Sequence, residues 1–433
     1  MFDRIRRARR SARVARTAAR IYIGYKRTQR HVRGKSPDVV DAAWDARHRQ
    51  FAEALYRLAV DLKGLYIKTG QFVGTRADVF PEPYTRSLSR LQDRVPPRDA
   101  AIVRRTIEAE LGGPVDSLFA RFDDVPLATA SLAQVHRAAL ADGREVVVKV
   151  QHPEVAALVR LDLRNLQALV GIIARREPTF DYRAIVKEIG AQVPHELDFV
   201  REAVMMERVS ANLAGIPSVV VPRVVEGMVS RRVLVTEYLD GLRLLGEAHI
   251  SDTSIDGPAF ARTLAAAYGH MLLVDGLFQA DPHPGNILIL PDGKVGLLDF
   301  GLTKELPDPI RVGFARLVIG AGERDVAGIL AAFAELGMKT REDAPEPVLN
   351  LMRLFFDARE GTAVFREDRA RALNQNPVDA IPADLVLLGR VIGLLRGVCS
   401  SLGSPLSPMQ MLRPFAERAV AGTTPPVPAA AGE

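Results

Sequence analysis

The stretch that decides the fold runs from Asp281 to Gly301 and reads DPHPGNILILPDGKVGLLDFG. It places Asn286 five residues after Asp281 on a polar loop, and Asp299 thirteen residues after Asn286. The apolar runs between them predict a hairpin that turns at residues 291–293, because Asp-Gly pairs favour tight turns. A carboxylate and an amide on one loop, with a second carboxylate delivered by the hairpin, are oxygen ligands of the kind that Mg²⁺ prefers.

The spacing of these three residues is typical of the catalytic and metal loops of protein kinases, which read Asp-x₄-Asn followed by Asp-Phe-Gly. In that arrangement Asp281 accepts or orients a proton from the attacking group, while Asn286 and Asp299 face the metal. The alternative is two ordinary turn aspartates, since Asp-Phe-Gly alone arises often by chance. The full spacing favours the kinase-like interpretation.

A kinase-like chain also needs a strand lysine for the nucleotide phosphates and a loop that covers them. The run EVVVKVQ supplies Lys149 near the end of an apolar strand, where a charge needs a partner. About twenty residues earlier, where kinases carry a glycine-rich loop, the chain reads LATASLAQV. Alanine does not enter the positive-φ conformations open to glycine, so we expect a stiffer loop. Its predicted nucleotide contacts are Ala128, Thr129, Ala130 and Ser131.

Carboxylates that could pair with Lys149 occur in the helical stretch QVPHELDFVREAVMMER. Glu196, Asp198 and Glu202 are the three candidates, and their spacing alone leaves the choice open. Further on, VTEYLDG predicts a hinge to a larger lobe. We expect the backbone of residues 237–239, which are Glu237, Tyr238 and Leu239, to hydrogen-bond an adenine.

A fourth signal is KTGQ, in which Lys68, Gly70 and Gln71 interrupt an apolar helical face. A glycine inside a helix costs about 1 kcal/mol relative to alanine, so another interaction should offset it. Close helix packing is one explanation. We favour the other, a polar insertion toward the nucleotide site.

The charge is divided unevenly along the chain. Residues 1–35 hold thirteen Lys and Arg against one acid, so their net charge is +12. The remaining residues carry 45 basic and 51 acidic side chains, a net charge of −6. This basic arm can be read as a solvated tail, as a contact for anionic lipid headgroups or as a nucleic-acid contact. No base-reading motif supports the last of these, and we expect no nucleic acid partner.

The single cysteine, Cys399, excludes an internal disulfide framework and predicts a reducing, cytoplasmic compartment. No window reaches the eighteen or more uncharged apolar residues that span a bilayer. The best window, residues 385–403, is interrupted by Arg390 and Arg396 and predicts a buried or surface-docked helix.

Periodicity and turn residues predict five segments along the chain. They are a basic arm (1–35), a helical extension carrying KTGQ (36–115), a smaller lobe with the alanine-rich loop and strand lysine (116–239), a larger lobe with the catalytic and metal loops (240–420), and a disordered Pro/Ala-rich tail (421–433).

Together these motifs resemble the AarF/UbiB family of atypical kinases, which is linked to isoprenoid-quinone biosynthesis. The resemblance runs from about Lys63 to Leu306 and depends on KTGQ, ATAS, ELD, DPHPGN and DFG in this order. It implies an α+β, bilobal, protein-kinase-like fold that is rich in helix. It also implies that the helical N-terminal extension packs over the active site.

The resemblance implies roles for the motif residues. Lys149 contacts the ATP phosphates, Asp281 occupies the position of the catalytic base, and Asn286 and Asp299 hold Mg²⁺. ATP and Mg²⁺ are therefore the expected cofactors.

It also implies a division of the ion pairs. Glu202 is expected to pair with Lys149, while Glu196 and Asp198 engage Lys68.

The function implied is that of an ATPase or a small-molecule or lipid kinase that supports isoprenoid-quinone synthesis. The alternative is a nucleotide-binding scaffold or pseudokinase partner of a biosynthetic complex. A conventional Ser/Thr protein kinase is disfavoured, because LTKELPDPIRVGFARL enters a helix soon after Gly301 and leaves little room for an activation loop. Expected partners are a nucleotide, an isoprenoid or quinone-precursor lipid, complex partners or a second copy, and the inner membrane face through the basic arm.

Overall fold

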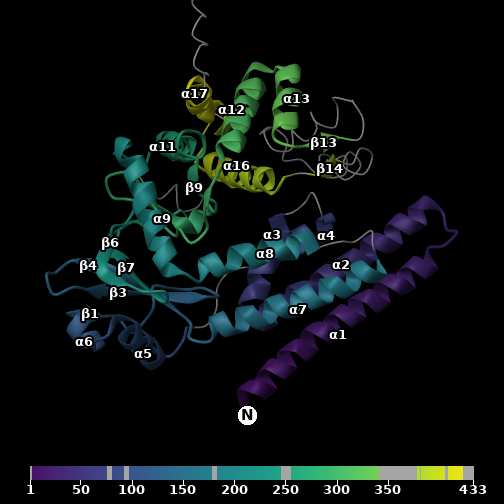
Figure 1. Cartoon of the computed structure of the whole chain (residues 1–433), viewed down its shortest axis with the longest axis horizontal. Helices are drawn as coiled ribbons and strands as arrows, with labels where there is room; N and C mark the ends of the chain where they lie inside the picture. Colours follow the sequence, from purple (N-terminus) through teal and green to yellow (C-terminus); the bar gives the residue numbers. More distant parts are fainter. Residues whose placement is uncertain are drawn as a thin grey trace, which may run out of the picture. The chain divides into compact units, whose positions relative to one another are not determined.

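The computed structural model divides the chain into two compact units. The first unit comprises Met1–Arg201 and Val224–Tyr238, and the second comprises Glu202–Arg223 and Leu239–Glu433. Figure 1 draws both units and labels many of their helices and strands. The structure describes residues 2–75, 80–91, 97–177, 183–244, 255–340, 378–380, 382–404 and 408–422.

The first unit begins with two long helices, α1 (Phe2–His31) and α2 (Pro37–Leu62). They pack against each other, and α1 also packs against α7 (Val155–Arg176) (Figure 1). Val14 on α1 is only 5% exposed. Residues 2–31 are therefore a docked helix, and their reading as a solvated tail is wrong.

An ion pair fixes α1 in this position. The Arg10 guanidinium donates to both oxygens of Asp162 on α7, at 2.7 and 2.6 Å, and to the carbonyl of Leu62 at 2.6 Å. The Asp162 side chain is completely buried. A buried carboxylate needs a charged partner, so α1 supplies a contact that α7 requires.

A six-stranded antiparallel sheet forms the smaller lobe, in the order β1-β3-β4-β7-β6, with β2 paired to β3. Its central strand β4 buries Val146, Val148 and Val150 on one face, as expected for a side-chain period of two. These valines share a core with residues of α5 and β7. The bounds are β1 Arg121–Phe122, β2 Ala128–Thr129, β3 Ala133–Ala139, β4 Glu145–Gln151, β6 Val224–Val229, β7 Val233–Glu237, α5 Ala100–Leu111 and α6 Val115–Leu118.

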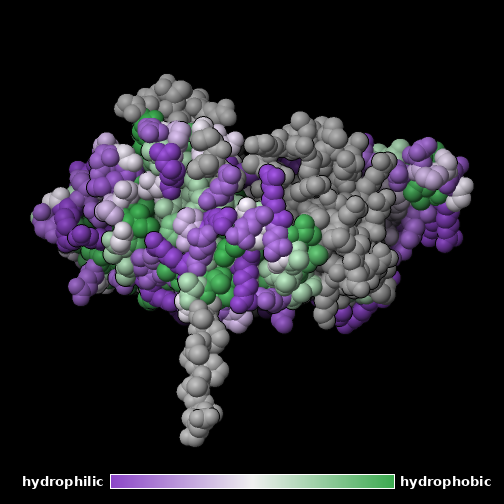
Figure 2. Space-filling model, turned by 90° about the horizontal axis from the view of Figure 1, so that it is seen from above, coloured by the Kyte–Doolittle hydropathy of each residue, from purple (hydrophilic) through white to green (hydrophobic). Residues whose placement is uncertain are grey.

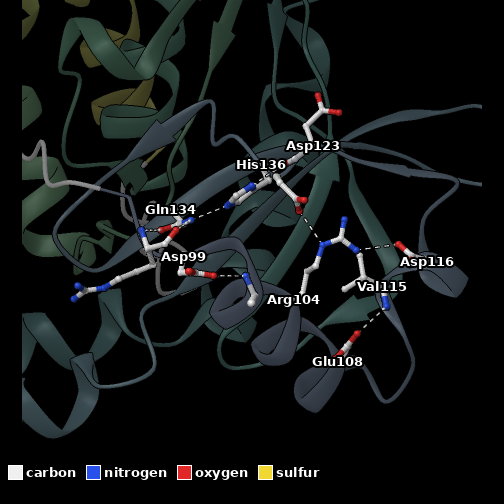
Figure 3. Close-up of polar contacts among 11 residues, drawn as sticks. Asp99, Arg104, Glu108, Val115, Asp116, Asp123, Gln134 and His136 are labelled. Atoms are coloured by element: carbon white, nitrogen blue, oxygen red, sulfur yellow. Dashed lines mark hydrogen bonds and ion pairs between the residues drawn. The ribbon is translucent and has the colours of Figure 1, made fainter.

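A polar network fastens the segment before α5 to this sheet (Figure 3). The Arg98 N–H donates to the side-chain oxygen of Gln134 at 2.8 Å, and the Gln134 amide lies 2.8 Å from His136 Nε2. His136 Nδ1 lies 2.8 Å from the carbonyl of Asp123, so the neutral ring donates there and accepts from Gln134. Asp99 caps the start of α5 through the N–H of Ala101.

The helical extension and the smaller lobe belong to one unit. Leu65 at the start of α3 and Leu132 beside the alanine-rich loop share a buried cluster with residues of α7 and α8. This unit therefore combines three predicted segments, 1–35, 36–115 and most of 116–239. Residues 202–223 differ from the predicted ranges, because they group with the second unit. The remaining helices here are α3 Leu65–Thr75, α4 Glu82–Leu88, α8 Arg183–Glu196 and the start of α9 Phe199–Asn212, which lies in the second unit from Glu202 onward.

The second unit is mainly helical, with small sheets in the orders β5-β11-β10-β8, β12-β9 and β13-β14. The predicted hairpin around residues 291–293 is confirmed, since β10 pairs with β11 and Gly293 has φ +76°. Its helices are η1 Leu213–Gly215, α11 Gly257–Gly269, the π-helix η2 His270–Asp275, η3 Pro284–Asn286, α12 Asp308–Glu323, α13 Val326–Glu335, α16 Ala383–Ser401 and α17 Pro408–Ala421. Its strands are β5 Val219–Val220, β8 Leu242–Arg243, β9 Leu277–Gln279, β10 Ile287–Ile289, β11 Val295–Leu297, β12 Thr303–Glu305, β13 Lys339–Thr340 and β14 Val378–Ala380.

The predicted buried helix corresponds to α16, in which Leu388, Val391 and Ile392 are at most 1% exposed. In the part of the chain that the structure describes, no helix has the length and apolarity needed to cross a bilayer. On the face drawn in Figure 2, hydrophobic residues form small patches among hydrophilic ones. Of the predicted disordered tail, residue 421 ends α17 and residues 423–433 lie outside the described part.

Candidate functional site

Lys149 lies on the central strand of the first unit, paired with Val135 on β3 and Leu234 on β7. Its side chain leaves the sheet on the face opposite the buried valines, because side chains alternate along a strand. The ammonium lies 5.1 Å from the centre of the Phe199 ring at the start of α9. This aromatic face offers a favourable cation–π contact to the lysine.

The alanine-rich loop is a tight turn between β2 and β3. Ala128 pairs with Val135 and Thr129 with Gln134, and the Ala130 N–H donates to the carbonyl of Ala133 at 2.8 Å. The four predicted nucleotide contacts, Ala128 to Ser131, thus lie on a hydrogen-bonded hairpin.

Two residues that sequence reasoning missed organise the surroundings of Lys149. His152 Nε2 lies 3.0 Å from the carbonyl of Ala130, so this side chain ties the alanine-rich turn to the end of β4. The Gln151 amide donates to the carbonyl of Leu197 at 2.8 Å, which fastens the Glu-Leu-Asp turn to the same strand. Both are buried polar residues at the end of an apolar strand, and that is the signal that could have identified them.

Gly70 is explained by close helix packing, which corrects our preference for a polar insertion at this position. A Cβ atom on Gly70 would lie 2.2 Å from Leu91 Cδ1. One turn later, a Cβ on Gly74 would lie 2.9 Å from the backbone nitrogen of Ser89. The two glycines therefore allow α3 to approach the segment that follows α4. Gln71 lies on α3, but its side chain is outside the described part of the structure.

Lys68 on α3 contacts the Glu-Leu-Asp turn. Its ammonium lies 3.0 Å from Glu196 Oε2, in a pair whose side chains are 25% and 14% exposed. The expected contact of Lys68 with Glu196 is therefore present. Asp198 has a different local role, because it accepts the N–H of Arg201 at 3.3 Å and lies 3.7 Å from Arg231.

The predicted hinge coincides with a crossing between the units, since Tyr238 ends the first unit and Leu239 begins a segment of the second. The Tyr238 N–H donates to the carbonyl of Glu145 at 3.0 Å. Its ring lies under the Arg137 guanidinium, 4.2 Å from centre to Cζ. Because this N–H is already used by the sheet, an adenine would have to bond to other backbone groups near Glu237.

In the second unit, the Asp281 loop follows β9 and is closed by Asn286. The carbonyl of Asp281 accepts the His283 N–H at 2.7 Å and the Asn286 side-chain amide at 3.2 Å. His283 Nδ1 in turn accepts the Gly285 N–H at 3.1 Å and caps η3. These bonds fix the loop from both of its ends.

Asp299 takes a left-handed backbone conformation, with φ +57°. Only three non-glycine residues in the described ranges do so, and strained conformations of this kind cluster at functional sites. The Gly301 N–H donates to Asp299 Oδ1 at 3.2 Å. The Phe300 N–H donates to Glu202 Oε1 at 3.3 Å, and Glu202 is buried.

Glu202 is thus placed against the Asp-Phe-Gly turn. Lys149 belongs to the other unit, so the pairing of Glu202 with Lys149 stays a prediction.

A buried glutamine holds the Asp-Phe-Gly turn. The Gln279 amide donates to the carbonyls of Leu298 and, at 2.8 Å, of Asp299, while its oxygen accepts from the Tyr268 hydroxyl. Burial, and secondarily the charge of Asp281, raise the pKa of Tyr268, so its hydroxyl remains a donor. Gln279 precedes Asp281 by two residues, and it therefore links the Asp281 loop to the Asp-Phe-Gly turn. Sequence reasoning missed it.

Arg390 on α16 contacts the predicted base directly. Its Nη2 lies 2.8 Å from Asp281 Oδ1, and the two side chains are 21% and 31% exposed. The sequence offered a signal for this contact, because a charge within an apolar helix needs a partner.

Asn286 and Asp299 offer hard oxygen donors that fit Mg²⁺. Since the Asn286 amide nitrogen donates to Asp281, its amide oxygen is left as an acceptor. Mg²⁺ is usually held by one or two carboxylates together with substrate phosphates and water, so this donor set suffices. Within the described ranges, no group of three or more His, Cys, Asp or Glu side chains gathers as a metal site.

Comparisons with known proteins agree with these motifs. The ABC1 atypical kinase-like domain matches residues 90–333. AarF domain-containing protein kinase 1 of Gallus gallus is 32% identical over 393 residues, covering 84% of this chain and 73% of the relative. Protein ACTIVITY OF BC1 COMPLEX KINASE 8, chloroplastic, of Arabidopsis thaliana is 34% identical over 299 residues, which cover 67% of this chain and 39% of that relative.

A solved structure shares the fold. The complex of Rv3197 with erythromycin from Mycobacterium tuberculosis matches with a TM-score of 0.58 and 25% identity, over 89% of this chain and 98% of that one. The expected α+β, helix-rich, protein-kinase-like fold is therefore confirmed. The chain belongs to the family of ABC1/AarF atypical kinase-like proteins.

Proposed function

We propose that this chain is an ATP- and Mg²⁺-dependent enzyme, either an ATPase or a kinase of a small lipid-like molecule, that supports isoprenoid-quinone biosynthesis. The observation that carries the proposal is the bonded arrangement in the second unit. Asn286 closes the loop of Asp281, and Gln279 holds the backbone of Asp299. Membership of a kinase-like family supports this reading.

In this proposal Asp281 accepts the proton of the attacking hydroxyl or water. Asn286 and Asp299 would hold Mg²⁺, which when bound neutralises charge on the nucleotide phosphates. Lys149 contacts the phosphates, and the alanine-rich turn, residues 128–131, restrains them.

The segment after the Asp-Phe-Gly turn favours a small acceptor over a protein. β12, residues 303–305, pairs with β9 at once, and α12 begins at Asp308. Conventional protein kinases place a longer activation segment here, which supports the peptide substrate. Only a few residues separate Gly301 from α12 in this chain.

We also propose that α1 contacts anionic lipid headgroups. Arg9, Arg13, Arg16, Arg20 and Arg27 are all exposed, and their spacings of three, four and seven residues place them on one helical face. The exposed side chains of Ile5 and Ile23, at 41% and 50%, fall on the same face. Basic residues mixed with apolar ones are typical of helices that lie on a membrane surface.

Phosphate release from ATP and Mg²⁺ tests the catalytic proposal. We expect Asp299→Asn to reduce turnover by roughly 100-fold or more, because a metal ligand loses its charge. Asp292→Asn is the matched control, since Asp292 lies in the exposed β10–β11 turn and pairs with Lys294. Nucleotide binding by the wild type without any turnover would instead support the scaffold alternative.

Co-sedimentation with anionic vesicles tests the lipid contact. The variant carrying Arg16→Gln, Arg20→Gln and Arg27→Gln should lose most binding. A control with Arg49→Gln, Arg57→Gln and Arg105→Gln removes the same charge from exposed positions outside α1. Equal binding by the two variants would contradict the proposal.

A further inference from the structure

Arg390 is a costly residue at its position. It lies on α16 among Leu388, Val391 and Ile392, which are at most 1% exposed. Its Nε is buried and finds no acceptor in the described part of the chain. A buried donor without a partner destabilises the folded state, so packing alone does not account for an arginine here.

The contact that Arg390 does make is specific. Its Nη2 donates to Oδ1 of Asp281 at 2.8 Å, across 109 residues of sequence. The backbone carbonyl of Asp281 is used separately, by His283 and Asn286. The loop backbone is therefore fixed by the loop itself, while the orientation of the carboxylate is set by α16.

We propose that Arg390 is a positioning residue for the reaction: it holds Oδ1 of Asp281 and so presents Oδ2 as the proton acceptor. This inference rests on the proposed function. In the step, the attacking oxygen forms a bond to the γ-phosphorus of ATP, and the bond from that phosphorus to the bridging oxygen breaks, with ADP leaving. The proton of the attacking oxygen passes to Oδ2 of Asp281 and then to solvent. Arg390 keeps its protons throughout.

A fixed carboxylate is a better base in this setting than a rotating one, because proton transfer requires hydrogen-bond geometry with the acceptor already in place. Removing Arg390 should therefore lower kcat and leave the binding of ATP nearly unchanged. If the ion pair only fastened α16, removing Arg390 would lower the thermal stability of the protein but would not lower kcat selectively.

The experiment compares Arg390→Gln, Arg390→Lys and the control Arg413→Gln. Arg413 on α17 also forms an ion pair between helices of the second unit, 2.8 Å from Glu323 on α12, and a second pair with Glu417, and neither glutamate belongs to the proposed site. We expect kcat to fall roughly 10- to 100-fold in Arg390→Gln, with KM for ATP within about threefold. Arg390→Lys keeps a cation and should recover much of the loss, while Arg413→Gln should match the wild type.

A second measurement reports the ion pair without turnover. Carbodiimide-driven amidation with glycinamide labels accessible carboxyl groups, and peptide mass spectrometry follows Asp281. Labelling of Asp281 should rise several-fold in Arg390→Gln and stay unchanged in Arg413→Gln. Unchanged labelling in Arg390→Gln would overturn the inference.

The remaining outcomes are also decisive. Raised labelling with unchanged kcat would show a structural pair only and would overturn the positioning role. If Arg390→Lys and Arg390→Gln lose kcat equally and lose thermal stability to a matching degree, the pair is structural, and this outcome would also overturn the positioning role. A wild type without turnover would defeat the proposed function itself, and the inference with it, whereas an active wild type with an equally active Arg390→Gln defeats the inference alone.

Discussion

The side-chain amide of Gln279 donates to the backbone carbonyl of Asp299 at 2.8 Å, although twenty residues separate them in sequence. The same amide reaches the carbonyl of Leu298, and the glutamine oxygen accepts from Tyr268. The side chains of Gln279 and Tyr268 are both fully buried. One uncharged residue therefore sets the backbone from which the predicted metal ligand projects.

Replacing Gln279 with Leu should destabilise the second unit and weaken its response to Mg²⁺. The change leaves two carbonyls and one hydroxyl without partners, so the free energy of unfolding should fall by about 3 kcal/mol. Asp299 also loses the bond that supports its φ of +57°. Thermal unfolding and the Mg²⁺ concentration for half-maximal turnover measure the two effects.

Tyr268→Phe is the matched control for this prediction. It removes only the hydroxyl and keeps both bonds from Gln279 to the carbonyls, so it should cost about 1 kcal/mol and leave the Mg²⁺ response unchanged. Equal effects of the two variants on Mg²⁺ would contradict a role for Gln279 in holding Asp299.

Gly70→Ala should destabilise the first unit, because the new methyl group would overlap Leu91. Overpacking of this kind typically costs about 1–3 kcal/mol. Gly171→Ala on α7 is the control: its Cβ would meet no atom within 4 Å, so the substitution should stabilise by about 0.5–1 kcal/mol. Thermal unfolding of both variants decides the point, and a neutral Gly70→Ala would refute the packing account.

The Lys68–Glu196 pair should couple α3 to the end of α8. A double-mutant cycle with Lys68→Met and Glu196→Gln should give a coupling free energy of about 0.5–1.5 kcal/mol, since the pair is largely but not fully removed from water. Asp198→Asn serves as the comparison, because Asp198 caps α9 instead. A coupling near zero would mean that the contact at 3.0 Å does not persist in solution.

His136 should make the first unit sensitive to acid. Burial lowers the pKa of His136 below the ordinary value of 6.5, so the unfolded chain takes up its proton first. The stability that the neutral ring contributes is therefore present above about pH 6.5 and is lost as the pH falls toward the folded pKa. Thermal unfolding from pH 8 to 5 should show a smaller loss in His136→Gln than in the wild type.

His31→Gln is the control for that experiment, because His31 is exposed on α1. Parallel pH profiles for the wild type and His136→Gln would exclude this histidine as the source of the acid sensitivity.

The shape of the Asp281 loop and of the hairpin that follows it could be predicted from sequence because both depend on local residues, while their catalytic and metal-binding roles stay predictions. The five-residue spacing from Asp281 to Asn286 fits one short loop, and Asp-Gly residues specified the hairpin that leads to Asp299. The contact of Lys68 with Glu196 was also expected, although that expectation came from the family resemblance.

The contact partners of the supporting residues could not be predicted, because these contacts join residues far apart in sequence. Arg390 meets Asp281 through a helix that follows it by about a hundred residues, and no periodicity encodes that meeting. Gly70 illustrates a different limit. The sequence predicted that Gly70 lies in a helix. It did not predict that Leu91 packs against this position, because that contact depends on tertiary packing.

The buried carboxylate of Asp162 has a practical consequence for anyone shortening this protein. Trimming the chain up to residue 31 as a dispensable leader would strip Arg10 away and leave an uncompensated negative charge inside the remaining fragment. If such a fragment were insoluble, the cause would be that Asp162 has lost its charged partner, and not that the chain has lost a membrane anchor.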